Sequence, residues 1–160
     1  MTHRARTMKE GEMHEVLYAM RFRGQAEPIG EVGNVLKATT SAPSCAITSQ
    51  VGAGGVVGTL AAVPGEEATF ASEVTFTGET SFQETGTITF GEGNILTFST
   101  VGSGYLAPCA DPTRKQGTVM WRIDAGEGQF AGASGLITSN FFVDDHFGVV
   151  DHHFGVLLLP

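Results

Sequence analysis

Asp124-Ala-Gly-Glu-Gly-Gln-Phe-Ala-Gly-Ala-Ser-Gly-Leu136 stands between one strand-like run and the next. Its four glycines, at positions 126, 128, 132 and 135, surround a single phenylalanine. Glycine adopts positive φ angles without strain and lets another part of the backbone approach closely. We therefore expect this segment to form a corner of a closed sheet, with Phe130 plugging the end of an apolar interior.

Apolar and polar side chains alternate along the runs on both sides of this corner, as they do in half-buried strands. No run of ten or more residues shows the 3.6-residue period of an amphipathic helix. We expect loops over residues 24–33 and 102–116. The expected strands cover residues 14–23, 34–40, 45–51, 56–63, 72–77, 85–90, 95–101, 117–124, 136–143 and 149–159.

Regularly spaced strands with turn signals between them favour a small barrel over an open sheet, because closure removes both sheet edges. A barrel of eight strands has an interior just wide enough for side chains or for one small ligand. The sequence therefore predicts an all-β fold, a small closed antiparallel barrel of about eight strands whose lumen can hold a ligand.

The composition narrows the choice of partner. The 160-residue chain has a formal net charge of −8 and only nine lysines and arginines. Nucleic acids and anionic membrane surfaces attract basic side chains, so we expect neither as a partner. No stretch has the roughly 18 consecutive apolar residues of a membrane-spanning helix. We expect a cytoplasmic protein with a flexible leader over residues 1–12 and a single domain over residues 13–160.

The two cysteines, Cys45 and Cys109, can form at most one disulfide, and neither stands in a spacing typical of zinc ligands. Because cysteines of cytosolic proteins usually stay reduced, we favour two free thiols. The sequence alone leaves their pairing open.

The segment from Ile123 to Gly135, followed by one strand, a short turn and a final strand, resembles the glycine corner of the allene oxide cyclase and dirigent-like β-barrels. The shared pattern is G-x-G-x-F-x-G-x-x-G between two apolar strands. The resemblance extends to the end of the chain and, more loosely, to the expected hairpin over residues 85–101.

Members of that superfamily are cofactor-free barrels, often dimers or trimers, whose apolar lumen steers a reactive intermediate such as an epoxide or quinone methide into one product. The resemblance thus implies a homodimer or homotrimer that acts on a small apolar substrate without a cofactor. The polar catalytic residues of allene oxide cyclase have no motif match in this chain and are not transferred.

A dense polar cluster, Asp144-Asp-His-Phe-Gly-Val-Val-Asp-His-His-Phe-Gly155, precedes the C-terminus. In an extended strand His152 and Phe154 point to one face, while Asp151 and His153 share the other. Either His152 is the titratable group in a dry lumen, or Asp151 and His153 form an acid–base dyad there. The non-catalytic alternatives are a core histidine for His152 and a surface or interface pair for the other two. The large apolar companions of His152 favour its face as the inner one.

A metal site is not expected in this cluster. Zinc or iron needs three or four ligands that converge on one point, and neighbours in a strand point apart. The spacings H-x-H and H-E-x-x-H are also missing from the sequence.

Other candidate site residues come from the remaining strands. Tyr18 is a candidate catalytic hydrogen-bond donor, because a buried phenol requires a partner. For the aromatic and apolar side chains, packing in the core is the alternative to substrate contact. The candidate substrate-binding residues are Met20, Phe22, Phe76, Phe98, Trp121, Asn140 and Phe154.

These observations lead to a hypothesis of function. We expect a cofactor-independent isomerase, cyclase or lyase that acts by acid–base chemistry on a small hydrophobic molecule, such as a terpenoid or oxylipin epoxide. The alternative is a non-catalytic barrel that carries a hydrophobic ligand. A third interpretation, compatible with both, is an assembly subunit that buries the outer side chains of Leu17, Ile137 and Phe141 in a symmetric interface.

Overall fold

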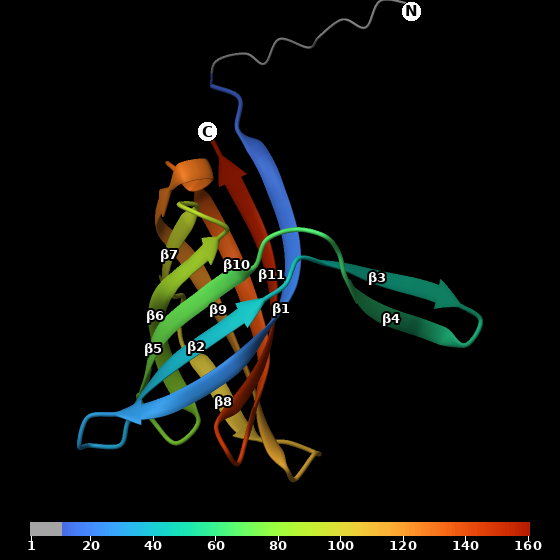
Figure 1. Ribbon diagram of the computed structural model, residues 1–160. Coiled ribbons are helices and arrows are strands. Elements are labelled where there is room, and N and C mark those ends of the chain that lie inside the picture. The colour runs from blue at the N-terminus through green and yellow to red at the C-terminus, as the bar shows by residue number, and fades with distance from the viewer. Residues whose placement is uncertain (1–10) are drawn as a thin grey trace, which may run out of the picture.

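The alternating segments form antiparallel strands in a computed structural model, which describes residues 11–160 (Figure 1). The expected leader lies mostly outside these residues, at positions 1–10. The strands are β1 (His14–Ile29), β2 (Val35–Ala42), β3 (Cys45–Gly52), β4 (Gly55–Ala62), β5 (Ala68–Phe76), β6 (Ser81–Phe90), β7 (Ile95–Thr100), β8 (Gly104–Pro108), β9 (Arg114–Glu127), β10 (Ser134–Asp144) and β11 (Gly148–Leu159).

Eight of these strands close into a barrel, in the order β10-β11-β1-β2-β5-β6-β7-β9, and β9 pairs with β10 to complete the ring. The short strand β8 lies beside β9 and also pairs with the beginning of β6. The predicted fold class is confirmed. Over residues 11–160 one turn of 3-10 helix, Gly128–Phe130, is the sole helix, and no helix there is long and apolar enough to span a membrane.

Two predicted loops were wrong in part. Strand β1 continues to Ile29, because its second half pairs with β2 over Arg23–Ile29. The predicted loop 102–116 contains β8 and the first residues of β9. Strand β8 has only five residues and ends at a proline, so alternation within it is too short to detect. Its pairing with strands distant in sequence makes it a strand.

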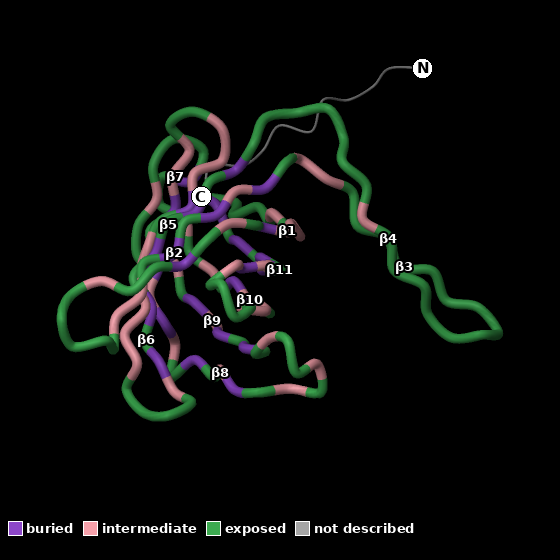
Figure 2. The backbone as a smooth tube through the Cα atoms, turned by 60° about the horizontal axis from the view of Figure 1, so that its bottom comes forward, coloured by how far each residue is buried: buried purple, intermediate pink, exposed green. Residues whose placement is uncertain are grey.

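Strands β3 and β4 pair only with each other in the second, two-stranded sheet and do not enter the barrel ring. Together they form a hairpin that projects away from the barrel, and nearly all of it is exposed (Figures 1 and 2). We call residues 45–62 the arm. The sequence predicts both strands but does not predict that they leave the barrel.

The glycine corner has the predicted role. Gly128, Gly132 and Gly135 have φ angles of 62°, 74° and 132°, which favour glycine. Phe130 is 3% exposed and packs against Phe90, with 5.3 Å between ring centroids. The phenylalanine therefore closes the corner end of the barrel interior.

Replacing Gly126 by alanine is expected to lower the free energy of unfolding by about 1–3 kcal/mol. A Cβ atom on Gly126 would overlap the backbone carbonyl of Phe130, which cannot move without reshaping the corner. Urea denaturation monitored by Trp121 fluorescence measures the change. The matched control is Gly52→Ala in the arm, where a Cβ meets no atom within 4 Å. Equal stability of both variants would contradict this account of the corner.

Candidate functional site

The last strand decides between the two alternatives for the polar cluster. Asp151 and His153 are buried inside the barrel, 6% and 2% exposed, whereas His152 is exposed on the outer face. The expectation that His152 lies in the lumen is therefore wrong. The apolar side chains that share a face of β11 with His152 do not mark the inner face, because Phe154 among them is also outside and 50% exposed.

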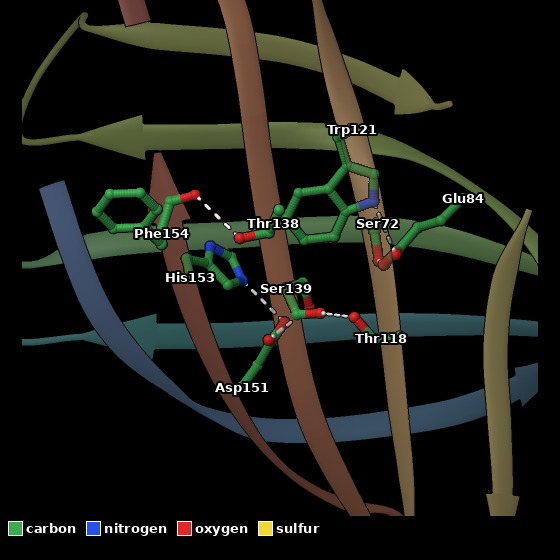
Figure 3. Close-up of polar contacts among 9 residues, drawn as sticks. All are labelled: Ser72, Glu84, Thr118, Trp121, Thr138, Ser139, Asp151, His153 and Phe154. Carbon is green, nitrogen blue, oxygen red and sulfur yellow. Dashed lines mark hydrogen bonds and ion pairs between the residues drawn. The ribbon is translucent and has the colours of Figure 1, made fainter. Parts of the chain in front are cut away.

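Asp151 is held by two hydrogen bonds inside the barrel (Figure 3). The Oγ hydroxyl of Ser139, on the neighbouring strand β10, donates to Oδ1 at 2.6 Å. The Nε2 atom of His153 lies 2.8 Å from Oδ2. The two side chains of the predicted dyad thus meet on one face of β11, as the two-residue spacing requires.

The imidazole of His153 is enclosed by aromatic rings. It stacks on Phe22 at a centroid distance of 4.3 Å and meets the edges of Trp121 and Phe70 at 5.0 and 5.3 Å. Its Nδ1 atom is buried without a hydrogen-bond partner. A neutral ring that carries its proton on Nε2 leaves no buried N–H unpaired, so we assign Nε2–H as the donor to Asp151.

A second buried carboxyl group, Glu84 on β6, was not among the predicted site residues. It is 6% exposed. The hydroxyl of Ser72 donates to its Oε1 at 2.6 Å, and the indole N–H of Trp121 donates to its Oε2 at 3.1 Å (Figure 3). The sequence contained an indication that Glu84 faces inward. It is separated by an even number of residues from Ile88 and Phe90, so the three side chains share one face of the strand.

Burial raises the pKa of Glu84 to about 8, since the charged form loses its hydration. The negative charge of Asp151 raises this pKa further, while the hydrogen bonds from Ser72 and Trp121 oppose the shift. At neutral pH Glu84 is therefore mostly a neutral carboxylic acid, able to donate a proton.

An apolar cavity lies against both carboxyl groups. Its volume is about 50 Å³. Its lining is apolar except for Thr40, Glu84 and Asp151, and the Thr40 hydroxyl is buried without a partner. The other lining residues are Ala26, Leu36, Ala38, Phe70, Val74, Phe76, Phe82, Leu106, Phe141, Val143 and Val149.

Many of these residues lie where strands end, opposite the glycine corner. Phe76 ends β5, and Val149 is the second residue of β11. Further along β11, Asp151 lines the cavity, and His153 lies beyond it among the rings of Phe22, Phe70 and Trp121. The lumen is thus open at the end opposite the glycine corner. Glu84 and Asp151 lie at the inner end of this cavity, and aromatic rings fill the lumen between them and the corner.

The predicted substrate-binding residues divide into three groups. Phe76 lines the cavity. Met20, Phe22, Phe98 and Trp121 point inward but pack in or against the core, so they do not line it. Asn140 and Phe154 are exposed on the outer face, and the expectation that they face the lumen is wrong.

Tyr18 points inward, and its ring occupies the space that a side chain at position 155 would fill, which only Gly155 permits. Burial raises the pKa of the Tyr18 phenol above its ordinary value, and the charge of Asp151 adds to the shift, so the hydroxyl keeps its proton. Its hydroxyl has no hydrogen-bond partner but does not line the cavity. A catalytic role for Tyr18 stays a prediction.

Neither thiols nor metal ligands gather at this site. Cys45 and Cys109 are both free. Within residues 11–160 no group of three or more His, Cys, Asp or Glu side chains is arranged to hold a metal ion.

Comparison with solved structures matches the whole barrel to a known fold. A pterocarpan synthase dirigent protein superposes with a TM-score of 0.58 at 12% sequence identity, and the match covers 100% of this chain and 98% of that one. The chain has the dirigent-like β-barrel fold. No protein-family model matches the sequence, and no curated protein matches it significantly.

The dirigent-like barrel confirms the resemblance seen in the glycine corner. The burial of the side chains corrects part of the prediction that Leu17, Ile137 and Phe141 lie outside at an interface. Leu17 is exposed, but Ile137 is fully buried and Phe141 lines the cavity. Both side chains face inward because they share the inner face of β10 with Ser139.

Proposed function

We propose that this dirigent-like barrel catalyses a cofactor-independent isomerisation, cyclisation or lyase reaction of a small hydrophobic substrate, such as a terpenoid or oxylipin epoxide. The observation that carries the proposal is a pair of buried carboxyl groups, Glu84 and Asp151, facing one apolar cavity from different hydrogen-bond environments. Carboxyl groups in unlike environments are suited to separate acid and base roles.

Glu84 is the proposed acid. Its pKa of about 8 keeps the proton on the carboxyl group at neutral pH. In the proposed step this proton passes to the epoxide oxygen while a C–O bond breaks, which leaves an alcohol and a positively charged carbon. Water is largely kept out by the apolar lining, so the proton transfer is not diverted to solvent.

Asp151 is the proposed base. Its carboxylate takes a proton from the carbon next to the positive centre, and the bonding electrons form a double bond. Where the substrate holds an internal hydroxyl group, its oxygen attacks the positive carbon and closes a ring instead, and Asp151 takes the proton of that hydroxyl. Return of the proton from Asp151 to Glu84 restores the starting state, so the product is an isomer of the substrate. His153 and Ser139 are positioning residues, because they hold the Asp151 carboxylate through its two oxygens.

A carrier of an apolar ligand would need the cavity but not the carboxyl groups. Burying two carboxyl groups costs stability, and neither forms an ion pair with a lysine or arginine in the described part of the chain. Their position at the cavity wall favours catalysis over simple binding. The dirigent protein with the same fold is named as a pterocarpan synthase, and this name supports a catalytic role for this barrel.

Incubation of the protein with a panel of terpene and fatty-acid epoxides is expected to produce an isomer that buffer alone does not form. Chiral gas chromatography with mass spectrometry measures the product. Leu106→Trp should abolish its formation, since Leu106 is half-buried in the cavity lining and an indole there blocks the lumen. His152→Ala is the matched control and should retain full turnover, because His152 lies outside the barrel.

The outcomes separate enzyme from carrier. If the panel binds but is recovered unchanged, the carrier interpretation replaces the proposal. Turnover that survives in Leu106→Trp would place the reaction outside the lumen and overturn the assignment of Glu84 and Asp151.

A further inference from the structure

Thr40, on β2, carries an unpaired hydroxyl group at the wall of the cavity. In the described part of the chain, the buried side-chain atoms without a hydrogen-bond partner belong to Tyr18, Thr40 and His153. Of these three residues, Thr40 is the one that lines the cavity. It is 4% exposed. Its hydroxyl is therefore shielded from bulk water as well as unpaired.

The other buried serine and threonine side chains each have a partner. Ser72 and Ser139 donate to the two carboxyl groups at the cavity, both at 2.6 Å (Figure 3). Thr100 donates to the backbone carbonyl of Glu84 at 2.9 Å. Buried polar groups in folded proteins are nearly always hydrogen-bonded. The unpaired hydroxyl of Thr40 is thus an exception within this barrel.

Packing does not explain the hydroxyl. The neighbouring inward side chains of β2 are Ala38 and Ala42, which are apolar and buried. Valine has nearly the same shape as threonine and would fill the same space. A buried hydroxyl that pairs with nothing lowers stability, whereas a valine methyl group there does not. A molecule in the cavity that hydrogen-bonds to Thr40 would remove this cost.

Thr40 lies between the two carboxyl groups around the barrel wall. In the ring, β2 is the middle one of the five consecutive strands β11-β1-β2-β5-β6. Thr40 is therefore two strands away from Asp151 on β11 and two strands away from Glu84 on β6. All three side chains line the same cavity of about 50 Å³. A small molecule that contacts the proposed acid and base there also comes close to Thr40.

The group that fits Thr40 best is another hydroxyl. A hydroxyl group both donates and accepts, so two of them can pair in either direction. Rotation about the Cα–Cβ bond exchanges the places of the threonine hydroxyl and methyl, so the hydroxyl can turn toward a ligand without a backbone shift. A charged group would lose its hydration in the apolar lining, and an anionic one would also be repelled by Asp151.

We propose that Thr40 is a specificity-determining residue of the lumen, and that the molecule bound there carries a hydroxyl group that pairs with the Thr40 hydroxyl. The substrate class is then a hydroxylated epoxide, such as the epoxide of a terpene alcohol, rather than an epoxide without other polar groups. This substrate class rests on the proposed function. Recognition of the hydroxyl group does not, because it requires binding and not turnover.

Binding of limonene and carveol to the full chain tests the proposal. These cyclic terpenes share one carbon skeleton, and carveol adds a single hydroxyl group. Neither holds an epoxide, so neither undergoes the proposed reaction. Headspace gas chromatography measures the free concentration of each terpene above the protein solution and hence both Kd values. In Thr40→Val the ratio of the limonene Kd to the carveol Kd should be about tenfold lower than in the wild type, because one hydrogen bond is lost.

Two control variants should keep the wild-type ratio. Thr40→Ser retains the hydroxyl group, and Thr87→Val makes the same change as Thr40→Val at an exposed position on β6. Urea denaturation without ligand gives a second readout. Thr40→Val should unfold at the same urea concentration as the wild type or a higher one, since it removes an unpaired hydroxyl. Thr100→Val should unfold at a lower concentration, since it removes a paired one.

The outcomes separate this proposal from the proposed function. A ratio in Thr40→Val within twofold of the wild type would overturn the role of Thr40, and so would a wild type that binds neither terpene. A lower ratio in Thr40→Ser or Thr87→Val, or a Thr40→Val that unfolds at lower urea, would do the same. If epoxides are still turned over in that case, Thr40 alone loses its role. The expected fall in the ratio, in a protein that turns over no epoxide, supports recognition at Thr40 and removes the proposed function.

Discussion

Replacing Asp151 by asparagine is expected to reduce turnover of the responsive epoxide by about 100-fold or more while KM changes little. Loss of a well-placed acid or base commonly lowers a rate by about 10²–10⁴-fold. Asparagine keeps the shape of the side chain and can still accept the hydrogen bond from Ser139, but it cannot take up a proton. Steady-state kinetics of product formation separates kcat from KM.

The same substitution at Asp145 is the matched control, since this carboxylate is exposed in the turn between β10 and β11. Asp145→Asn should keep wild-type turnover. Thermal unfolding of both variants distinguishes a chemical effect from loss of structure. Turnover of folded Asp151→Asn within threefold of the wild type would remove Asp151 from the proposed mechanism.

The alternation of apolar and polar side chains and the glycine corner were sufficient to predict the barrel. Strand periodicity reports which side chains share a face, and the glycines report where the chain must turn sharply or approach closely. Alternation does not report which of the two faces is inside. In β11 the apolar row that contains Phe154 and Val156 competes with the row that contains Asp151 and His153, and hydrophobicity alone favours the wrong one.

The outer row of β11 gives a physical reason for that error. Phe154, Val156 and Leu158 are apolar although they lie outside and are 37–50% exposed. An apolar outer row leaves the same pattern in a sequence as a buried core. The polar row faces inward because Asp151 and His153 satisfy each other and Ser139 completes the set, a partnership that requires the register between β10 and β11.

Glu84 could not be recognised as a candidate site residue from its own strand alone. Its partners, Ser72 and Trp121, come from β5 and β9, which lie far apart in the sequence. The parity of Glu84 with Ile88 was visible, but a lone carboxylate on an apolar row becomes a candidate site residue only when the cavity beside it is known. The arm is a similar case, because its strands look like barrel strands until their pairing is seen.

Replacing Glu84 by glutamine is expected to remove most of the loss of stability that the wild type shows as pH rises from about 4.5 to about 8. The pKa of Glu84 is about 8 in the folded protein, against an ordinary value of 4.5. Below pH 4.5 both states hold the proton, so burial carries no ionisation cost. Between these values the unfolded chain releases a proton that the folded protein keeps. Stability therefore falls by up to about 1.4 kcal/mol for each pH unit.

Over the full interval, from 4.5 to about 8, this amounts to roughly 5 kcal/mol. Urea denaturation of the wild type and of Glu84→Gln at pH 5, 6, 7 and 8 measures this loss. The free energy of unfolding of the variant minus that of the wild type should increase at each step in pH. Glu79→Gln, an exposed carboxylate in the turn before β6, should run parallel to the wild type. If Glu84→Gln also runs parallel to the wild type, Glu84 is ionised in the folded protein at neutral pH and cannot supply the proton that the proposed reaction requires.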